Sequence, residues 1–288
     1  MFKLPWVTSR YGRGGQFAAA PAAPAGTSFA YDLDDGTGTT DAVPIIHMDA
    51  GENVTTSGSL TSGNVSQWSS RINTWHMQGD GGGLAYSPFL DTASSNMNGK
   101  PTLLNDGVTW FRGIPDTPLP IATDTSYWVI MALFVPVGFA SVKHLWSTLP
   151  TGVTHTTSTW GIHYARLINS GGTDYFYMKG VKTDTVGQVI SPTSGAHVYA
   201  WQINGTESYA YDNLNRGKFN GDAGAHNAEN DIVLCSFHYT RAYDLITGYE
   251  FAEIFILDDL SVEMDGNTVT GGDYKVIADY LSTKYDIS

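Results

Sequence analysis

The chain of 288 residues is 42% hydrophobic and only 15% charged, and it contains 32 glycines, 16 tyrosines and 8 tryptophans. This composition is typical of a folded, loop-rich protein and excludes an intrinsically disordered chain. The net charge of −13 disfavours contact with nucleic-acid phosphates, and the single cysteine, Cys235, allows no intrachain disulfide.

The first 26 residues differ in character from the rest, because they contain three cations and no acidic residue. Polar residues and Pro5 interrupt the run of roughly 7 to 15 apolar residues that a secretory signal requires, so we expect no signal peptide. Aromatic side chains and arginine dominate the binding energy of many interfaces. We therefore predict that residues 1–26 are an extended N-terminal arm that anchors to a partner, the alternative being a frayed terminus. The predicted partner-binding residues are Phe2, Leu4, Trp6, Arg10, Tyr11 and Arg13.

Residues 15–42 are dominated by Ala, Pro, Gly, Thr and Asp, which favours a connector, and we take 27–42 as the linker. Its aspartates could offer oxygen ligands to calcium, but their spacing departs from that of an EF-hand loop and no glutamate closes the site. The nearest histidines, His155 and His163, lack the spacing of a zinc site. We therefore expect no metal and no cofactor. The aspartates concerned are Asp32, Asp34, Asp35 and Asp41.

From Pro44 onward, short runs rich in β-branched and aromatic residues are bounded by turn-forming residues, which is typical of strands. The run WVIMALFV at 128–135 is apolar on both faces and predicts a central strand, whereas TWGIHYARLI at 159–168 alternates with a period of two. The longest apolar stretch is interrupted by Pro136 and Gly138, so we expect no membrane span, which needs roughly 18 apolar residues. The regular spacing of the runs predicts an all-β protein with two antiparallel sheets, a sandwich or jelly roll.

One helix is predicted at the C-terminal end of the sequence, after the pair Gly271-Gly272. Asp273 is placed to cap its N-terminus. A helix this short gains most of its stability by docking on the sandwich. Its apolar residues recur at i, i+3, i+4, i+7 and i+11 and form one stripe, which consists of Tyr274, Ile277, Ala278, Leu281 and Tyr285.

Short motifs at the end of the chain carry a resemblance to a known family. A strand containing Ala252-Glu253-Ile254 is followed by Leu260-Ser261 and by a helix that ends in Tyr280-Leu281 and Lys284-Tyr285. This order resembles the closing signature of the concanavalin A-like lectin/glucanase superfamily in its laminin-G-like branch. Three earlier segments are similar to the front half of that family, although Ser69 or Ser70 stands where an aspartate is usual. These segments are IIHMDAGENV, GNVSQWSSR and MNGKPTLLNDGVTWF.

The resemblance implies one domain over residues 43–288, a concanavalin A-like jelly-roll sandwich with a short C-terminal helix. Glucanases of this superfamily carry the acids Glu-x-Asp-x-x-Glu on one strand. Here the match that starts at Glu229 has Leu234 in the last place, and the match that starts at Glu263 has Thr268 there. We therefore predict that the chain is not an enzyme. Should it cleave polysaccharides, Glu253 and Glu229 are the first residues to substitute.

Other candidate residues have structural interpretations. The pair Asp258-Asp259 is predicted to end a strand through turn chemistry. Four aromatic residues in loop-like stretches could present flat faces to a sugar or could be buried in the sandwich, and the sequence leaves both open. These aromatic residues are Trp68, Trp75, Trp110 and Tyr86.

The layout of a basic, aromatic arm and a laminin-G-like domain resembles accessory structural proteins of tailed bacteriophages. The resemblance implies a non-enzymatic virion structural protein on the virion surface, in particular a capsid decoration protein. Its arm would bind the major capsid or tail protein, its sandwich would stabilise the particle or adhere to a cell-surface glycan, and it would form a homo-oligomer. The alternative is a carbohydrate-binding module or adhesin that acts through the sandwich face, and a third class is a glycan-cleaving enzyme with an unfamiliar site.

Overall fold

A computed structural model describes residues 31–33, 44–57, 64–79, 88–106, 111–113, 119, 121, 125–136, 143–150, 164–170, 173–179, 193–218, 222–224, 229–234, 247–258 and 260–288. The six predicted arm residues and most of the predicted linker lie outside these ranges. All strand pairings of the described residues are antiparallel and connect eighteen strands, and the one α-helix is C-terminal. The prediction of an all-β protein with a short C-terminal helix is therefore confirmed.

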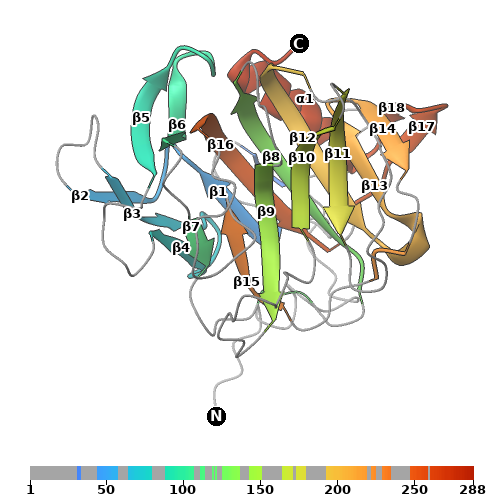
Figure 1. The fold of residues 1–288 in the computed structure, drawn as a ribbon, viewed down its shortest axis with the longest axis horizontal. Helices are drawn as coiled ribbons and strands as arrows, with labels where there is room; N and C mark the ends of the chain where they lie inside the picture. The colour runs from blue at the N-terminus through green and yellow to red at the C-terminus, as the bar shows by residue number, and fades with distance from the viewer. Residues whose placement is uncertain are drawn as a thin grey trace.

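One layer of strands lies beneath the helix (Figure 1). At its centre β16 pairs with β8, because both carry apolar residues on both faces and can be buried on both sides. The strand β1 lies on the other side of β16. In spatial order the strands are β1 (Ile46–Asp49), β16 (Thr247–Leu257), β8 (Tyr127–Val135), β12 (Gly195–Ile203), β13 (Tyr209–Asp212), β14 (Asn215–Lys218), β18 (Thr268–Gly271) and β17 (Glu263–Asp265).

The second series of strands packs against the opposite face of the first layer (Figure 1). Its spatial order is β11 (Thr173–Lys179), β10 (Tyr164–Ser170), β9 (Lys143–Pro150), β15 (Glu229–Leu234), β7 (Phe111–Gly113), β4 (His76–Gly79), β3 (Asn64–Ser69) and β2 (Val54–Ser57). The hairpin of β5 (Phe89–Ser94) and β6 (Lys100–Asp106) joins the two, because β5 contacts β3 and β6 pairs with the start of β16. A short 3-10 helix, η2 (Gly205–Glu207), precedes β13.

The core is divided by the helix-bearing layer into two clusters. Val129 and Met131 of β8 face the second layer, whereas Trp128 and Ile130 face the helix, as the alternation of a strand requires. Across the interior, the ring of Trp146 on β9 lies 5.7 Å from the ring of Trp201 on β12, with the two rings edge to face. The alternating side chains of one strand thus contribute to both cores.

The helix α1 (Asp273–Tyr285) buries all five residues of the predicted stripe. Its cap differs from the prediction, since Gly272 is the N-cap residue and Asp273 is already in the first turn. The backbone of Gly272 has φ +85°, and a Cβ there would lie 2.5 Å from the carbonyl oxygen of Ser261. The Asp273 carboxylate instead accepts hydrogen bonds from the backbone and hydroxyl of Ser261, at 3.1 and 2.7 Å. Close approach of two backbones therefore selects glycine, and Asp273 fastens the helix to the preceding segment.

In the described part of the chain, no helix is long and apolar enough to cross a membrane. Cys235 lies outside the described residues.

Candidate functional site

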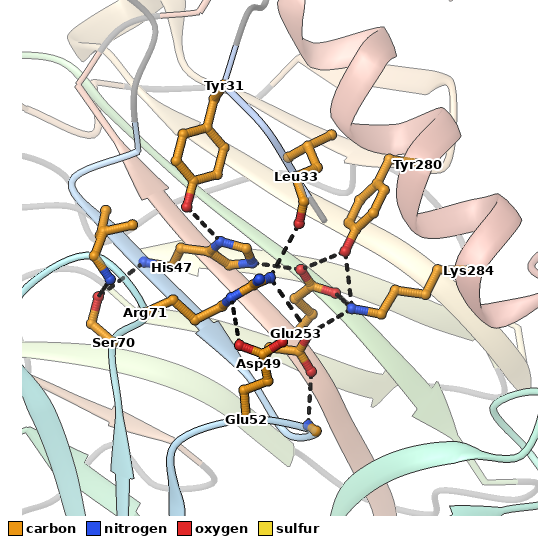
Figure 2. A network of polar contacts seen from close by, with 12 residues as sticks. Tyr31, Leu33, His47, Asp49, Glu52, Ser70, Arg71, Glu253, Tyr280 and Lys284 are labelled. Atoms are coloured by element: carbon orange, nitrogen blue, oxygen red, sulfur yellow. Dashed lines mark hydrogen bonds and ion pairs between the residues drawn. The ribbon is translucent and has the colours of Figure 1, made fainter. Parts of the chain in front are cut away.

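The residues that carried the family resemblance meet at one place, between α1 and the first layer of strands. Asp49 on β1 lies directly opposite Glu253 on β16; from the last turn of α1, Lys284 reaches both carboxylates and Tyr285 reaches Glu253. Figure 2 shows the side chains of Asp49, Glu253 and Lys284 pointing toward one another beside the helix. We call this group the Glu253 centre.

Glu253 is completely buried, and both of its oxygens accept hydrogen bonds from protein groups. Its Oε1 atom lies 2.5 Å from Nε2 of His47 and 3.3 Å from the Tyr280 hydroxyl. Its Oε2 atom accepts from the Lys284 amine at 2.8 Å and from the Tyr285 hydroxyl at 2.9 Å. A buried carboxylate with four donors is fully satisfied within the protein.

Asp49, which is 5% exposed, is held by a second set of donors. Its Oδ1 atom accepts from the backbone N–H of Gly51 at 2.7 Å, and Oδ2 accepts from Lys284 at 2.6 Å. Nη1 of Arg71 lies 3.8 Å from the same Oδ2 atom. The indole N–H of Trp68 donates to the backbone carbonyl of Asp49 at 2.9 Å, so the segment GNVSQWSSR, which contains Trp68, also contacts this strand.

The cations compensate the negative charges of Asp49 and Glu253. Without them the two carboxylates would repel each other, because they lie directly opposite one another on paired strands. Burial opposes the charge on Lys284, but Glu253 and Asp49 outweigh it and raise the pKa of the amine above its ordinary value. Burial lowers the pKa of His47 even though Glu253 acts in the other direction. The neutral imidazole donates from Nε2 to Glu253 and accepts at Nδ1 from the Tyr31 hydroxyl, 2.9 Å away.

The Glu253 centre joins α1 to β1 and β16 through hydrogen bonds and ion pairs. Glu253 was one of the two acids, with Glu229, to substitute first if the chain cleaves glycans, yet its burial and its four donors leave it no contact with a sugar. The contributions of His47 and Arg71 were not predicted. Each is an isolated residue in the sequence, and only the pairing of β1 with β16 brings His47 opposite Phe255, on which its ring stacks at 4.1 Å.

A second buried carboxylate holds the β5–β6 hairpin. Glu250 is 4% exposed and accepts hydrogen bonds from the amide of Asn96 at 2.6 Å and the hydroxyl of Thr102 at 2.9 Å. The hydroxyl of Ser94 donates to the same oxygen as Thr102. These donors are neutral and come from one hairpin, so this contact fixes the hairpin against β16.

A third polar group lies where β12 begins and β13 ends, and we call it the His197 centre. Nδ1 of His197 lies 2.8 Å from the Asp212 carboxylate, and Nε2 lies 3.3 Å from the hydroxyl of Thr193. His197 stacks on Tyr199, with ring centroids 4.8 Å apart. Thr193 is exposed and the Asp212 side chain is 13% exposed, so this group reaches the surface. Since a carboxylate only accepts, Asp212 orients the ring and leaves Nε2 to exchange hydrogen bonds.

Several residues that the sequence singled out are placed by the structure. Trp68 and Trp75 are buried in the core, so they offer no face to a sugar, while Trp110 and Tyr86 lie outside the described residues. Leu234, in the last place of the partial acid motif, belongs to the core between the layers. Position 234 therefore faces apolar neighbours.

The remaining acids are dispersed. Glu263 and Asp265 lie exposed on the short strand β17. Asp258 follows β16 in an exposed bend, in agreement with the predicted turn, and Asp259 lies outside the described residues. Within the described ranges, no group of three His, Cys, Asp or Glu side chains could hold a metal ion. Asp34, Asp35, Asp41, His155 and His163 are not among the described residues.

No protein-family model and no curated protein matches the chain. The solved structures that it resembles include an arabinofuranosidase complexed with arabinofuranosyl-α-1,2-xylobiose, with a TM-score of 0.50 and 8% identity over 85% of this chain and 60% of that one. A sialidase of Trypanosoma rangeli in complex with 2,3-difluoro-KDN has a TM-score of 0.49 and 6% identity over 91% of this chain. The chain spans only 36% of the sialidase and less than two thirds of the arabinofuranosidase. At these identities the likeness concerns the fold.

Two predictions are corrected by these comparisons. The fold is shared with an arabinofuranosidase, which contradicts the prediction of a non-enzymatic virion structural protein, in particular a capsid decoration protein, and the prediction from the missing linear acid motif that the chain is not an enzyme. The physical reason is that a linear acid motif excludes only one arrangement of carboxyl groups. Folding brings acids together from separate strands, as Asp49 and Glu253 show here.

Proposed function

We propose that the chain is a carbohydrate-recognising β-sandwich with the jelly-roll connectivity of the concanavalin A-like, laminin-G-like proteins. The observation that carries the proposal is the fold shared with an arabinofuranosidase whose structure contains an arabinofuranosyl-xylobiose. The family resemblance of the sequence supports it independently, because the motif residues Asp49, Trp68, Glu253 and Lys284 come together in one network. Residues 43–288 are the proposed unit.

The His197 centre is the proposed contact for the saccharide. Sugar sites combine a few placed polar groups with aromatic faces. The face of the first layer that carries Glu253 is covered by α1, and the opposite face is filled by the aromatic core. Where β12 begins, by contrast, the imidazole of His197, the carboxylate of Asp212 and the exposed hydroxyl of Thr193 form a group that reaches the surface, with His197 stacked on the buried ring of Tyr199. Sugar hydroxyls both donate and accept, and this set of groups does the same.

Binding of the full chain to an array of arabinose-containing, xylose-containing and sialylated oligosaccharides tests the proposal. We expect selective binding of one class, followed by measurement of its Kd by calorimetry. His197→Ala should then weaken binding about tenfold, which corresponds to the loss of one or two hydrogen bonds. Lys275→Ala, an exposed substitution on α1, is the matched control and should bind like the unmodified chain. No saccharide bound at millimolar concentration would refute the function, and unchanged binding by His197→Ala would refute the site.

Hydrolysis of a glycosidic bond is the second candidate function, and the fold shared with glycosidases favours it. Retaining enzymes need two carboxyl groups about 5 Å apart that both face the sugar. Glu229, at the start of β15, remains a candidate acid, whereas the carboxylate of Glu253 already accepts hydrogen bonds from protein groups beneath α1. With 4-nitrophenyl α-L-arabinofuranoside as the probe, loss of turnover in Glu229→Gln that keeps the saccharide affinity would indicate a catalytic acid. Absence of turnover in the unmodified chain leaves binding as the function.

A further inference from the structure

The Lys284 amine lies between two carboxylates that face each other across paired strands. Its Nζ atom is 2.6 Å from Oδ2 of Asp49 and 2.8 Å from Oε2 of Glu253, and it also donates to the Tyr280 hydroxyl at 2.9 Å. The amine of a lysine has three protons, so these partners account for all of them. We propose that Lys284 and Asp49 form an intramolecular amide bond without any added reagent, and that Glu253 carries the protons.

Water is largely excluded from the place where this bond would form. Glu253 is 0% exposed and Asp49 is 5% exposed, the Lys284 side chain is 21% exposed, and Tyr280 and Tyr285 flank the centre on the side of α1. An amine and a carboxyl group that contact each other in water condense only slowly, because each is solvated and mobile. Held in fixed contact, the same groups react as if at an effective concentration of about 10⁵ M or more.

The two carboxylates raise the pKa of the Lys284 amine and hold it protonated, so the reaction begins with the transfer of a proton to one of them. Amide formation then relieves the charge arrangement of the centre. Two buried carboxylates lie opposite each other on β1 and β16, an arrangement that is unfavourable unless cations compensate. Keeping an ion pair away from water also costs solvation free energy. Amide formation removes one positive and one negative charge together, while Glu253 retains His47 and the tyrosines as donors, and the net charge of the protein does not change.

The chemical step is balanced within the protein. A proton passes from Nζ of Lys284 to a neighbouring carboxylate, and the neutral amine attacks Cγ of Asp49. The Nζ–Cγ bond forms, the bond from Cγ to one carboxylate oxygen breaks, and that oxygen leaves as water with two protons that were on Nζ. Glu253 accepts a proton from the nitrogen and returns it to the leaving oxygen. No electrons are gained or lost, and no further reactant is needed.

Mass spectrometry of the purified, denatured full chain tests this proposal without reference to any sugar. We expect a mass lower by one water than that of the sequence, and a linked peptide after proteolysis that contains both Asp49 and Lys284. The link would also close most of the chain into a loop, so the denatured protein should migrate faster in a gel. A chain of full sequence mass after overnight incubation at neutral pH would overturn the proposal. So would a water loss located elsewhere, for example a succinimide at Asp265-Gly266.

Substitutions separate the roles of the three residues. Lys284→Arg keeps a cation but lacks the amine, and it should retain the full mass. Asp49→Asn should lose ammonia instead of water and reach the same linked mass as the unmodified chain. Glu253→Gln should link much more slowly, and linking at an unchanged rate would overturn the assignment of Glu253 as proton carrier. Lys275→Arg, on the exposed side of the same helix, is the matched control and should link normally.

Discussion

The Glu253 centre and the His197 centre are both built from a histidine, a carboxylate and a hydroxyl, yet they differ in what surrounds them. At the first, the entirely buried carboxylate of Glu253 accepts from four protein donors, one of which is the Lys284 cation. At the second, a single carboxylate holds His197, and Thr193 on the other ring nitrogen is exposed. The comparison teaches that the same residue types stabilise a fold where protein groups occupy every hydrogen-bonding position, and can serve recognition where one position faces the surface.

The largest effect is expected where the buried centre loses its central charge. Glu253→Ala leaves the Lys284 amine and the Tyr285 hydroxyl without their shared acceptor inside the protein. We expect the free energy of unfolding to fall by about 3 to 5 kcal/mol, as is typical when one member of a buried ion pair is removed. Urea unfolding followed by circular dichroism measures this. A loss below about 1 kcal/mol would show that the centre is not the fastening of α1.

The next largest loss of stability is expected at Gly272, the N-cap residue of α1. Gly272→Ala places a Cβ 2.5 Å from the carbonyl oxygen of Ser261 in a backbone with φ +85°, and we expect a loss of about 3 kcal/mol. Gly99→Ala is a matched control, because φ is +69° there but no atom lies within 4 Å of the added Cβ. It should cost about 1 kcal/mol, the conformational strain alone. Equal losses for the two variants in thermal unfolding would contradict the close contact.

A single hydrogen bond to the buried carboxylate should be worth less. Tyr285→Phe removes the hydroxyl that donates to Glu253 at 2.9 Å, and we expect a loss of about 2 kcal/mol because the acceptor is charged. Tyr209→Phe removes a hydroxyl that donates at 2.8 Å to the carboxylate of Glu207, which is exposed, and the loss should be clearly smaller because water screens that charge. If the two losses were equal, the burial of Glu253 would not be what makes the first bond strong.

The pH dependence of stability tests the burial of His47 and is a smaller effect. Burial lowers the pKa of His47 in the folded protein, so the unfolded chain binds a proton near pH 6.5 that the folded chain does not bind. The stability that His47 contributes is therefore present above pH 6.5 and falls as the pH drops below it, by at most about 1.4 kcal/mol per pH unit. His47→Gln should reduce this slope in unfolding measurements between pH 7.5 and 5. An unchanged slope would mean that His47 does not titrate in this way.

The smallest effect is expected on the exposed side of α1. Lys275 and Asp279 form an i,i+4 ion pair, with side chains that are 31% and 53% exposed. Lys275→Ala should change the free energy of unfolding by about 0.5 kcal/mol or less. This is the smallest of the predicted losses. A larger loss would show that exposed ion pairs, as well as the buried contacts beneath the helix, stabilise α1.

What the sequence determined by itself was local. The stripe from Tyr274 to Tyr285 gave the helix and its buried face, and the apolar run at 128–135 gave a central strand, because both depend on periodicities within one segment. The motifs around Asp49, Glu253 and Lys284 were noticed, but only the antiparallel register of β1 and β16 placed the two acids opposite each other with the lysine between them.

Only the tertiary structure decided which polar residues have all their hydrogen bonds inside the protein and which reach the surface. His47 and His197 look alike in the sequence, and pairing between distant strands gives one a buried carboxylate and the other a place beside an exposed hydroxyl. The same reason explains why a missing linear acid motif does not exclude an enzyme, since carboxyl groups assembled from separate strands leave no linear pattern. Local periodicity is written in neighbouring residues, whereas burial and charge partners arise from contacts between residues far apart in the chain.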